Sequence, residues 1–170
     1  YGNKSTDTVL RYSDTIINFF LENKTKAVII ACNTASAVAY PKLSKKYNIP
    51  IFNVVQPSVE YSNKISQTRE ICIIGTQGTI NSKAYTKSFL NIHSNCTITE
   101  IACPLFVPLI EEGWADSSIA KDVASIYLEA LKKTSIDTLI LGCTHYPIMA
   151  QTIQSVIENN IKLVYSGKTI

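Results

Sequence analysis

Two cysteines occur in matching sequence contexts, and their side chains are the ones most suited to acid or base chemistry. The two segments are Lys26-Ala-Val-Ile-Ile-Ala-Cys32-Asn33-Thr34 and Asp137-Thr-Leu-Ile-Leu-Gly-Cys143-Thr144-His145. Each pattern predicts a buried strand that ends at a cysteine, followed by the start of a helix. A helix N-terminus offers free N–H groups and a partial positive charge, which favour a carboxylate ligand and lower the pKa of a nearby thiol. We therefore expect two reactive thiols beside an anion site.

The elements that must position these cysteines alternate between strands and helices along the chain. The predicted strands are 26–31, 51–55, 70–75, 97–102, 138–142 and 161–165. The predicted helices are one capped by Ser5 or Thr6 and others near 34–47 (kinked or broken at Pro41), 81–90, 108–113, 117–133 and 147–159. This alternation predicts an α/β fold with parallel strands. In such folds ligands bind beyond the carboxyl ends of the strands, where both cysteines lie.

Two of these strands are continuous apolar runs without alternation. They are Ala-Val-Ile-Ile-Ala at 27–31 and Thr-Leu-Ile-Leu-Gly at 138–142. Continuous runs are typical of parallel strands that are buried on both faces. We expect both strands to be buried in this way.

Composition places the chain among ordinary globular proteins. It has 170 residues, 46% of them hydrophobic, and 16 basic against 13 acidic residues give a formal net charge of +3. The basic residues are scattered, so nucleic-acid binding is not expected. No apolar run reaches the roughly 18 residues that a membrane span needs, and the first residues do not form a secretory signal. We therefore expect a cytoplasmic protein.

The cysteine inventory argues against a disulfide framework and against a metal site. Five cysteines form an odd set with no CxxC pair and no zinc-type spacing. Free thiols in a reducing compartment fit this pattern. A cysteine within an apolar run usually packs as a small hydrophobe, which is our interpretation of Cys72, Cys96 and Cys103.

Several segments resemble the signature motifs of the glutamate racemase family, in the aspartate/glutamate racemase superfamily. They are Ala31-Cys-Asn-Thr-Ala-Ser-Ala37, Leu141-Gly-Cys-Thr-His-Tyr-Pro147, Ile74-Gly-Thr-Gln-Gly-Thr-Ile80 and Cys103-Pro-Leu-Phe-Val-Pro-Leu-Ile-Glu-Glu-Gly113, and Tyr1-Gly2 resembles the family's Pro-Tyr-Gly loop. The resemblance implies two pseudosymmetric parallel-sheet α/β domains with the active site between them. It also implies a cofactor-independent isomerase that interconverts L- and D-glutamate and supplies D-glutamate for peptidoglycan.

Inversion of a stereocentre by proton exchange requires a base on one face of the carbon and an acid on the other. By resemblance, Cys32 and Cys143 are these two groups, one as thiolate and one as thiol. His145 would polarise Cys143 or exchange a proton with it, and Glu111, favoured over Glu112, would assist. The residues expected to bind the substrate are Tyr1, Gly2, Asn33, Thr34, Thr76, Thr144 and His145, with Thr79 beside Thr76.

The chain departs from the family pattern at both ends. Family members begin earlier, with a strand that ends in an Asp-Ser pair, and they continue beyond the end of this sequence. We therefore expect residues 1–56 to form a partial first domain that lacks its N-terminal strand and its C-terminal return. Residues 57–165 are expected to form the second domain, and 166–170 the start of the return segment.

Three alternatives remain beside the glutamate racemase reading. A racemase for another amino acid, such as aspartate, would use the same two thiols, although His145 favours the glutamate branch. A noncatalytic amino-acid-binding or regulatory relative would keep the pocket but would not need both thiols. A redox or metal protein would need local cysteine pairs. A homodimer is possible, as in many family members.

Overall fold

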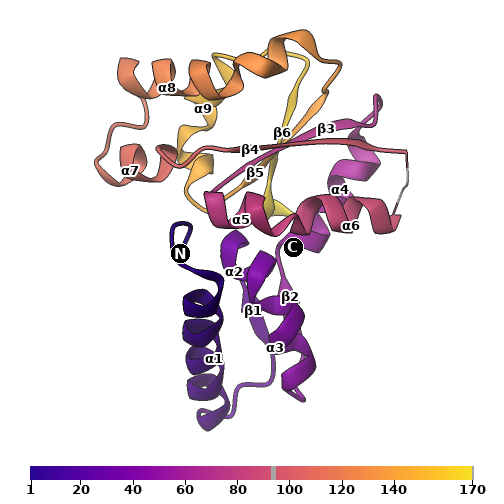
Figure 1. Cartoon of the computed structure of the whole chain (residues 1–170), viewed down its shortest axis with the longest axis vertical. Coiled ribbons are helices and arrows are strands. Elements are labelled where there is room, and N and C mark those ends of the chain that lie inside the picture. The colour runs from indigo at the N-terminus through magenta and orange to yellow at the C-terminus, as the bar shows by residue number, and fades with distance from the viewer. Residues whose placement is uncertain (93–94, 170) are drawn as a thin grey trace.

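The computed structural model describes residues 1–92 and 95–169 and contains two parallel sheets (Figure 1). Every strand pairing in this part of the chain is parallel. The predicted α/β class with parallel strands is therefore confirmed. Within the described residues, no helix combines the length and the apolar character that crossing a membrane requires.

The larger sheet has the strand order β4-β3-β5-β6. Its strands are β3 (Glu70–Gly75), β4 (Thr97–Ala102), β5 (Thr138–Gly142) and β6 (Lys162–Tyr165). The central strand β5 is buried along its whole length, as its continuous apolar run predicts. Gly75 pairs with Gly142, so β3 and β5 end at the same level of the sheet. The residues that follow these strands are thereby brought to one edge.

The smaller sheet pairs β1 (Val28–Ile30) with β2 (Ile51–Asn53). The apolar side chains on one of its faces pack against α1 (Thr6–Glu22), α2 (Asn33–Val38) and α3 (Tyr40–Lys46). The paired residues Ile29 and Phe52 point away from this cluster and are 55% and 54% exposed. The expectation that the first strand is buried on both faces is therefore wrong, because helices in the described residues cover one face of this sheet.

The first helices follow their sequence signals closely. Ser5 caps α1, and its hydroxyl accepts the amide N–H of Thr8. The helix predicted near 34–47 is broken at Ala39 into α2 and α3. Pro41 lies in the first turn of α3, where a backbone donor is not needed.

Other helices differ from the predicted ranges. The helix predicted at 81–90 is two helices, α5 (Gln77–Ser82) and α6 (Ala84–Ile92), separated by Lys83 in a left-handed conformation with φ 56°. The boundary expected between residues 56 and 57 lies within the first turn of α4 (Val55–Ile65). The remaining helices are α7 (Phe106–Glu111), α8 (Ser118–Leu128), η1 (Glu129–Lys133), η2 (Tyr146–Met149), α9 (Ala150–Gln154) and η3 (Ser166–Lys168).

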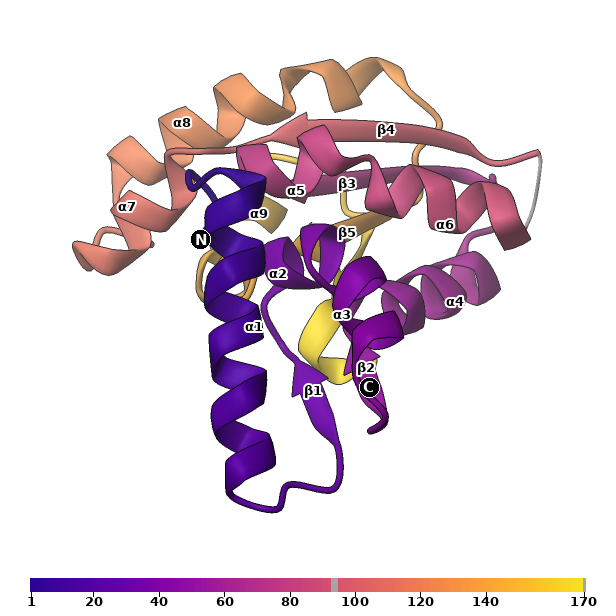
Figure 2. The same cartoon turned by 60° about the horizontal axis from the view of Figure 1, so that its bottom comes forward.

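The two sheets are joined through helices. In both views α2, at the end of the smaller sheet, lies against α5, which belongs to the larger sheet (Figures 1 and 2). The helix α6 also contacts α2, and η3 contacts α4 near the end of the chain. The end of β1 and the end of β5 therefore face a shared region. Of the segment expected to begin a return, Ser166–Lys168 form η3 and Thr169 is its C-cap residue, whereas Ile170 lies outside the described residues.

Candidate active site

Cys32 lies directly after β1 and is the N-cap residue of α2. Its sulfur accepts the backbone N–H of Ala35 at 3.5 Å. The side chain is partly exposed. The predicted arrangement of a strand, a cysteine and a helix start is therefore present, with a helix amide directed at the thiol.

Cys143 follows β5 and is 7% exposed. Burial raises the pKa of its thiol, the backbone amide of His145 lowers it, and charge on Cys32 raises it again. The amide of Tyr146 lowers it as well. The two sulfurs are thus close enough for the charge of one to oppose ionisation of the other, although they come from different sheets.

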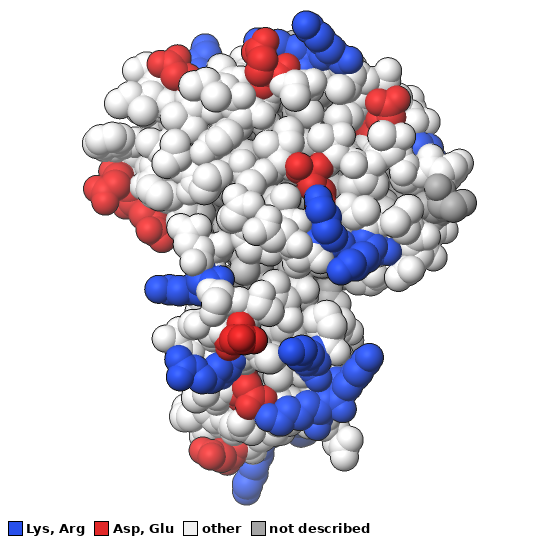
Figure 3. Space-filling view, viewed as in Figure 1, with Lys and Arg blue, Asp and Glu red and all other residues white. Residues whose placement is uncertain are grey.

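His145 lies between Cys143 and an acidic side chain. Its Nδ1 is 3.9 Å from the sulfur of Cys143, and its Nε2 is 3.3 Å from Oε1 of Glu111. Glu111 ends α7, and its side chain is 63% exposed. Of the two adjacent glutamates, Glu111 is the one paired with the imidazole. Figure 3 shows acidic side chains over α7, and both basic and acidic ones over the part of the molecule formed by α1–α3.

Three threonine hydroxyls meet beside the cysteines. Oγ1 of Thr34 lies 2.9 Å from Oγ1 of Thr76 and 3.1 Å from that of Thr79, and the last two are 3.1 Å apart. Thr76 also caps α5 by accepting the amide N–H of Thr79. All three side chains are buried. This cluster joins α2 to α5, so these residues have a structural role whether or not they contact a ligand.

Asn33, expected to bind substrate, uses its side chain inside the protein. Its Oδ1 accepts the hydroxyl of Tyr85 at 2.6 Å, and its Nδ2 donates to Oγ of Ser166 at 3.0 Å. Asn33 is 1% exposed. A ligand contact by Asn33 would therefore come from its backbone. Sequence reasoning did not single out Tyr85 or Ser166, because neither belongs to a motif containing a cysteine.

The Tyr1-Gly2 loop packs against the start of α5. The carbonyl of Gly2 accepts the amide N–H of Gly78 at 3.0 Å. A β-carbon at Gly2 would lie 2.5 Å from Cβ of Thr76, so the loop passes too close for any side chain. Tyr1 is 46% exposed, and its ring centroid lies 6.3 Å from that of Tyr12.

Thr144 is exposed between Cys143 and His145. Its hydroxyl oxygen lies 3.4 Å from Nδ1 of His145, the same ring nitrogen that faces the sulfur. The expected site residues thus form two groups with contacts inside each. One consists of the Tyr1-Gly2 loop and the threonine cluster, whose Thr34 lies two residues after Cys32. The other consists of Cys143, Thr144, His145 and Glu111.

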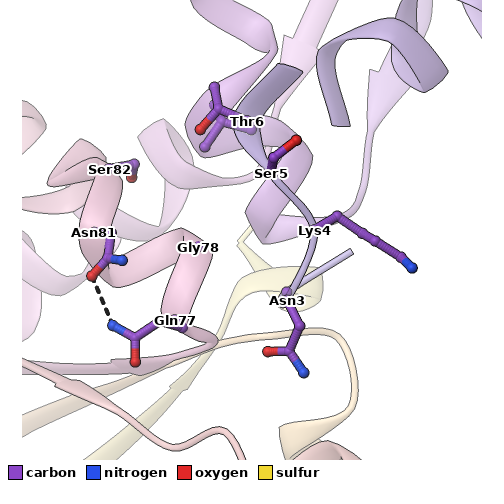
Figure 4. A pocket seen from close by; sticks show the side chains of 10 residues that line it. Asn3, Lys4, Ser5, Thr6, Gln77, Gly78, Asn81 and Ser82 are labelled. Atoms are coloured by element: carbon purple, nitrogen blue, oxygen red, sulfur yellow. Dashed lines mark hydrogen bonds between the residues drawn. The ribbon is translucent and has the colours of Figure 1, made fainter. Parts of the chain in front are cut away.

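A hollow of about 580 Å³ lies outside the cysteine pair. Figure 4 shows residues of the N-terminal segment on one side of it and residues of α5 on the other, with Gln77 donating to Asn81. It is lined by Gly2, Asn3, Lys4, Ser5, Thr6, Val38, Gln77, Gly78, Asn81 and Ser82. Neither cysteine lines it, so its size does not locate the chemistry. Within 1–92 and 95–169, no group of three or more His, Cys, Asp or Glu could hold a metal ion.

Comparison with known proteins supplies the family. The chain is 42% identical to the glutamate racemase of Geobacter metallireducens, over 99% of this chain and 62% of that protein. It is also 42% identical to the glutamate racemase of a Sulfurihydrogenibium species, over 100% of this chain and 68% of that one. The chain thus spans about two thirds or less of the length of these relatives.

Solved structures agree with the sequence relatives. A glutamate racemase isoform from Bacillus anthracis superposes with a TM-score of 0.95 at 30% identity, covering 99% of this chain and 64% of that one. The Francisella tularensis glutamate racemase, solved in complex with D-glutamate, gives 0.89 at 34% identity, covering 96% and 61%. Residues 5–168 match the family described as Asp/Glu/Hydantoin racemase. The chain therefore belongs to the Asp/Glu/Hydantoin racemase family.

Proposed function

We propose that this protein is a glutamate racemase that interconverts L- and D-glutamate by proton transfer at Cα, without a cofactor. The observation that carries the proposal is the pairing of two thiols from different sheets. Cys32 follows β1 and Cys143 follows β5, and charge on Cys32 raises the pKa of Cys143. A reaction that needs a base and an acid on opposite faces of one carbon is suited to such a pair.

The electrostatic coupling of the two thiols favours the state that racemisation needs. Because charge on Cys32 raises the pKa of Cys143, the pair is best occupied by one thiolate and one thiol. The thiolate removes the Cα proton, and the opposite thiol donates its own proton to the other face. The product then has inverted configuration, and the two sulfurs have exchanged protonation states. The reverse reaction uses the same groups with the roles exchanged.

His145 and Glu111 serve this reaction on the side of Cys143. The carboxylate of Glu111 holds the imidazole from Nε2, while Nδ1 faces the sulfur of Cys143. A ring held in this way can pass a proton to or from the thiol, because general acids and bases act best when a partner fixes their orientation.

Negative charge develops on the substrate as its proton leaves, and fixed donors must stabilise it. The backbone amides that follow each cysteine are such donors, because Cys32 caps α2 and the amides of His145 and Tyr146 point toward Cys143. We assign the substrate carboxylates to Thr34, Thr76 and Thr144, to the backbone of Asn33, and to the Tyr1-Gly2 loop. The hollow between the N-terminal segment and α5 does not enter this proposal.

The choice of glutamate rests on the relatives, whose printed names are glutamate racemases and one of which was solved with D-glutamate. We further propose that the product D-glutamate serves peptidoglycan synthesis in the cytoplasm, and that the enzyme can form a homodimer. Residues 1–56 and 57–165 would then contribute one cysteine each to a site between two α/β domains.

The test is proton exchange in heavy water with the protein expressed from its full coding sequence and no pyridoxal phosphate. NMR follows loss of the Cα proton of each glutamate enantiomer while circular dichroism follows inversion. Cys32→Ala and Cys143→Ala should each abolish inversion, whereas Cys96→Ala, a partly exposed thiol outside the site, should retain it. Inversion of aspartate but not glutamate would assign the sister specificity. Binding of glutamate without any exchange would contradict an enzymatic role.

A further inference from the structure

Tyr85 is a buried aromatic residue that touches the neighbours of both cysteines. It lies in the first turn of α6 and is 1% exposed. Its ring belongs to the apolar cluster between the larger sheet and α4, together with Val59, Ile73 and Ile140. The ring therefore has a fixed position, set by the core of the larger sheet.

The hydroxyl of Tyr85 holds the residue that follows Cys32. It donates to Oδ1 of Asn33 at 2.6 Å, and Asn33 is the first residue of α2. The amide of the same asparagine donates to Oγ of Ser166 in η3 at 3.0 Å. Two groups from the larger sheet's side of the molecule thus hold the start of α2, next to Cys32.

The ring edge of Tyr85 lies against the residue that precedes Cys143. A β-carbon at Gly142 would lie 3.5 Å from Cε2 of Tyr85 and 2.8 Å from the carbonyl oxygen of Ile74. The glycine therefore lets strand β5 approach both groups closely. Burial raises the pKa of Tyr85 well above its usual range, the Ser58 hydroxyl lowers it, and charge on Cys143 raises it, which agrees with this proximity.

We propose that Tyr85 is a positioning residue that sets the separation between Cys32 and Cys143. One rigid side chain contacts Asn33, next to the first thiol, and Gly142, next to the second. The proposal rests on the proposed two-thiol racemisation, in which both sulfurs must reach opposite faces of one carbon. Loss of the hydroxyl contact removes one of the two side-chain contacts that hold Asn33 and leaves the second thiol in place.

The start of α6 is itself held in place, as the positioning role of Tyr85 requires. Lys83, in its left-handed conformation, turns the chain between α5 and α6. Its Nζ lies 2.8 Å from Oε2 of Glu100, whose side chain is 2% exposed. The other oxygen of Glu100 accepts the hydroxyl of Thr86 at 2.8 Å. These contacts fix the residues on both sides of Tyr85 to strand β4.

The test compares a reaction that needs both thiols with one that needs a single thiol. Racemisation of glutamate needs both. With 3-chloroglutamate, one thiolate removes the Cα proton, the C–Cl bond breaks and chloride leaves. The resulting enamine tautomerises to the imine, and water hydrolyses this imine to 2-oxoglutarate and ammonium. This elimination requires no proton donor on the opposite face.

In Tyr85→Phe, the ratio of racemisation to elimination should fall about 10- to 100-fold, because small misplacements of a reacting group cost that much in rate. Ser166→Ala should lower the same ratio in the same direction. The matched control is Tyr127→Phe, which removes a hydroxyl that accepts the amide of Leu105 and should leave the ratio unchanged. General destabilisation would lower both reactions together.

An unchanged ratio in Tyr85→Phe, with wild-type racemisation present, overturns the positioning role and leaves the proposed function standing. A wild-type protein that carries out neither reaction overturns both proposals. A titration that does not depend on turnover tests the positioning role separately from the proposed function. In protein labelled with [3-¹³C]cysteine, removal of the Tyr85 hydroxyl should weaken the dependence of the Cys143 titration on Cys32, and an unchanged dependence counts against the spacing role.

Discussion

Glu111 Oε1 lies 3.3 Å from Nε2 of His145, the ring nitrogen opposite the one that faces Cys143. The exposed carboxylate of Glu111 thus contacts one nitrogen of the imidazole, and the other nitrogen faces the thiol of Cys143, which is 7% exposed. Because Glu111 lies at the surface end of this connection, it can be changed with little effect on the core. The relationship therefore offers a direct test of the acid and base machinery.

Glu111→Gln should lower kcat for racemisation about 10- to 100-fold, because the amide no longer attracts the imidazole as a carboxylate does. Glu112→Gln is the matched control. The side chain of Glu112 is exposed, and among the described residues the ion pair of His145 is with Glu111 instead. Circular dichroism of each enantiomer measures the rates. Equal losses in the two variants would contradict a specific role for Glu111.

Cys32→Ala should lower the pKa of Cys143. Burial keeps this pKa raised, but the contribution from charge on Cys32 disappears in the variant. The rate of alkylation of Cys143 as a function of pH should therefore shift to lower pH. Cys96→Ala should leave the profile where it is. A profile that does not move in Cys32→Ala would mean that the two sulfurs do not interact.

Gly2→Ala should weaken substrate binding. The added β-carbon would lie 2.5 Å from Cβ of Thr76, so the loop must move away from α5. Strain of this kind costs roughly 1–3 kcal/mol, which corresponds to about a 5- to 150-fold rise in KM. Gly167→Ala is the control, because a β-carbon there meets nothing within 4 Å. A normal KM in Gly2→Ala would remove the loop from the binding site.

Asp137 stabilises the loop that precedes β3. Burial opposes its charge, but the amide of Thr68, the hydroxyl of Ser66, the amide of Gln67 and the hydroxyl of Thr138 outweigh burial and lower the pKa to about 2. The carboxylate accepts the Ser66 hydroxyl at 2.7 Å and the Gln67 amide at 2.6 Å. It thus joins two segments that are distant in the sequence.

Asp137→Asn should lower the free energy of unfolding at pH 7 by about 1–2 kcal/mol, allowing for solvent screening. Because the folded pKa lies below that of the unfolded chain, the wild-type advantage is complete above about pH 4 and is lost as the pH falls toward 2. Urea unfolding at pH 7 and pH 3 measures it. The exposed Asp116→Asn should show no such difference; an equal effect there would refute the assignment.

Three strands of the larger sheet could be predicted to the residue, whereas the first strand of the smaller sheet could not. Predicted strands 70–75, 97–102 and 138–142 match β3, β4 and β5. Apolar runs define β3 and β5, and alternation of polar and apolar residues defines the edge strand β4. The predicted strand 26–31 shortens to Val28–Ile30, since β1 pairs with three residues of β2. The exposure of Ile29 depends on which elements cover its face of the sheet. The hydrophobic pattern of a strand does not indicate those elements.

The predicted helices do not include α4, because a proline at position 57 is typical of a break between elements. In the structure Pro57 lies in the first turn of α4, where its missing N–H costs nothing. Oδ1 of Asn53 accepts the amides of Val55 and Gln56, both at 2.9 Å, and so caps the helix. An asparagine followed by a proline four residues later was therefore a start signal. The predicted helix 81–90 begins later than α5 does. Thr76, which caps α5, lies in a glycine-containing segment that has the sequence of a turn.

The two cysteine motifs predict a candidate site, but they do not indicate which contacts hold its residues in place. Motif spacing places Cys32 and Cys143 after strands, and the structure brings His145 and Glu111 beside one of them. The partners of Asn33 lie 52 and 133 positions away along the chain. Contacts of such separation depend on how helices pack, and no local pattern indicates them.

The exclusively parallel pairing of the described strands also governs how the molecule assembles. Parallel neighbours cannot form hairpins, so each must wait for an intervening crossover to be made. Such nonlocal contacts slow refolding from denaturant. Since Cys143 follows β5, whose neighbours include β3 and the late strand β6, the two thiols meet near the end of this process. Recovery of turnover should therefore lag behind recovery of helical circular dichroism.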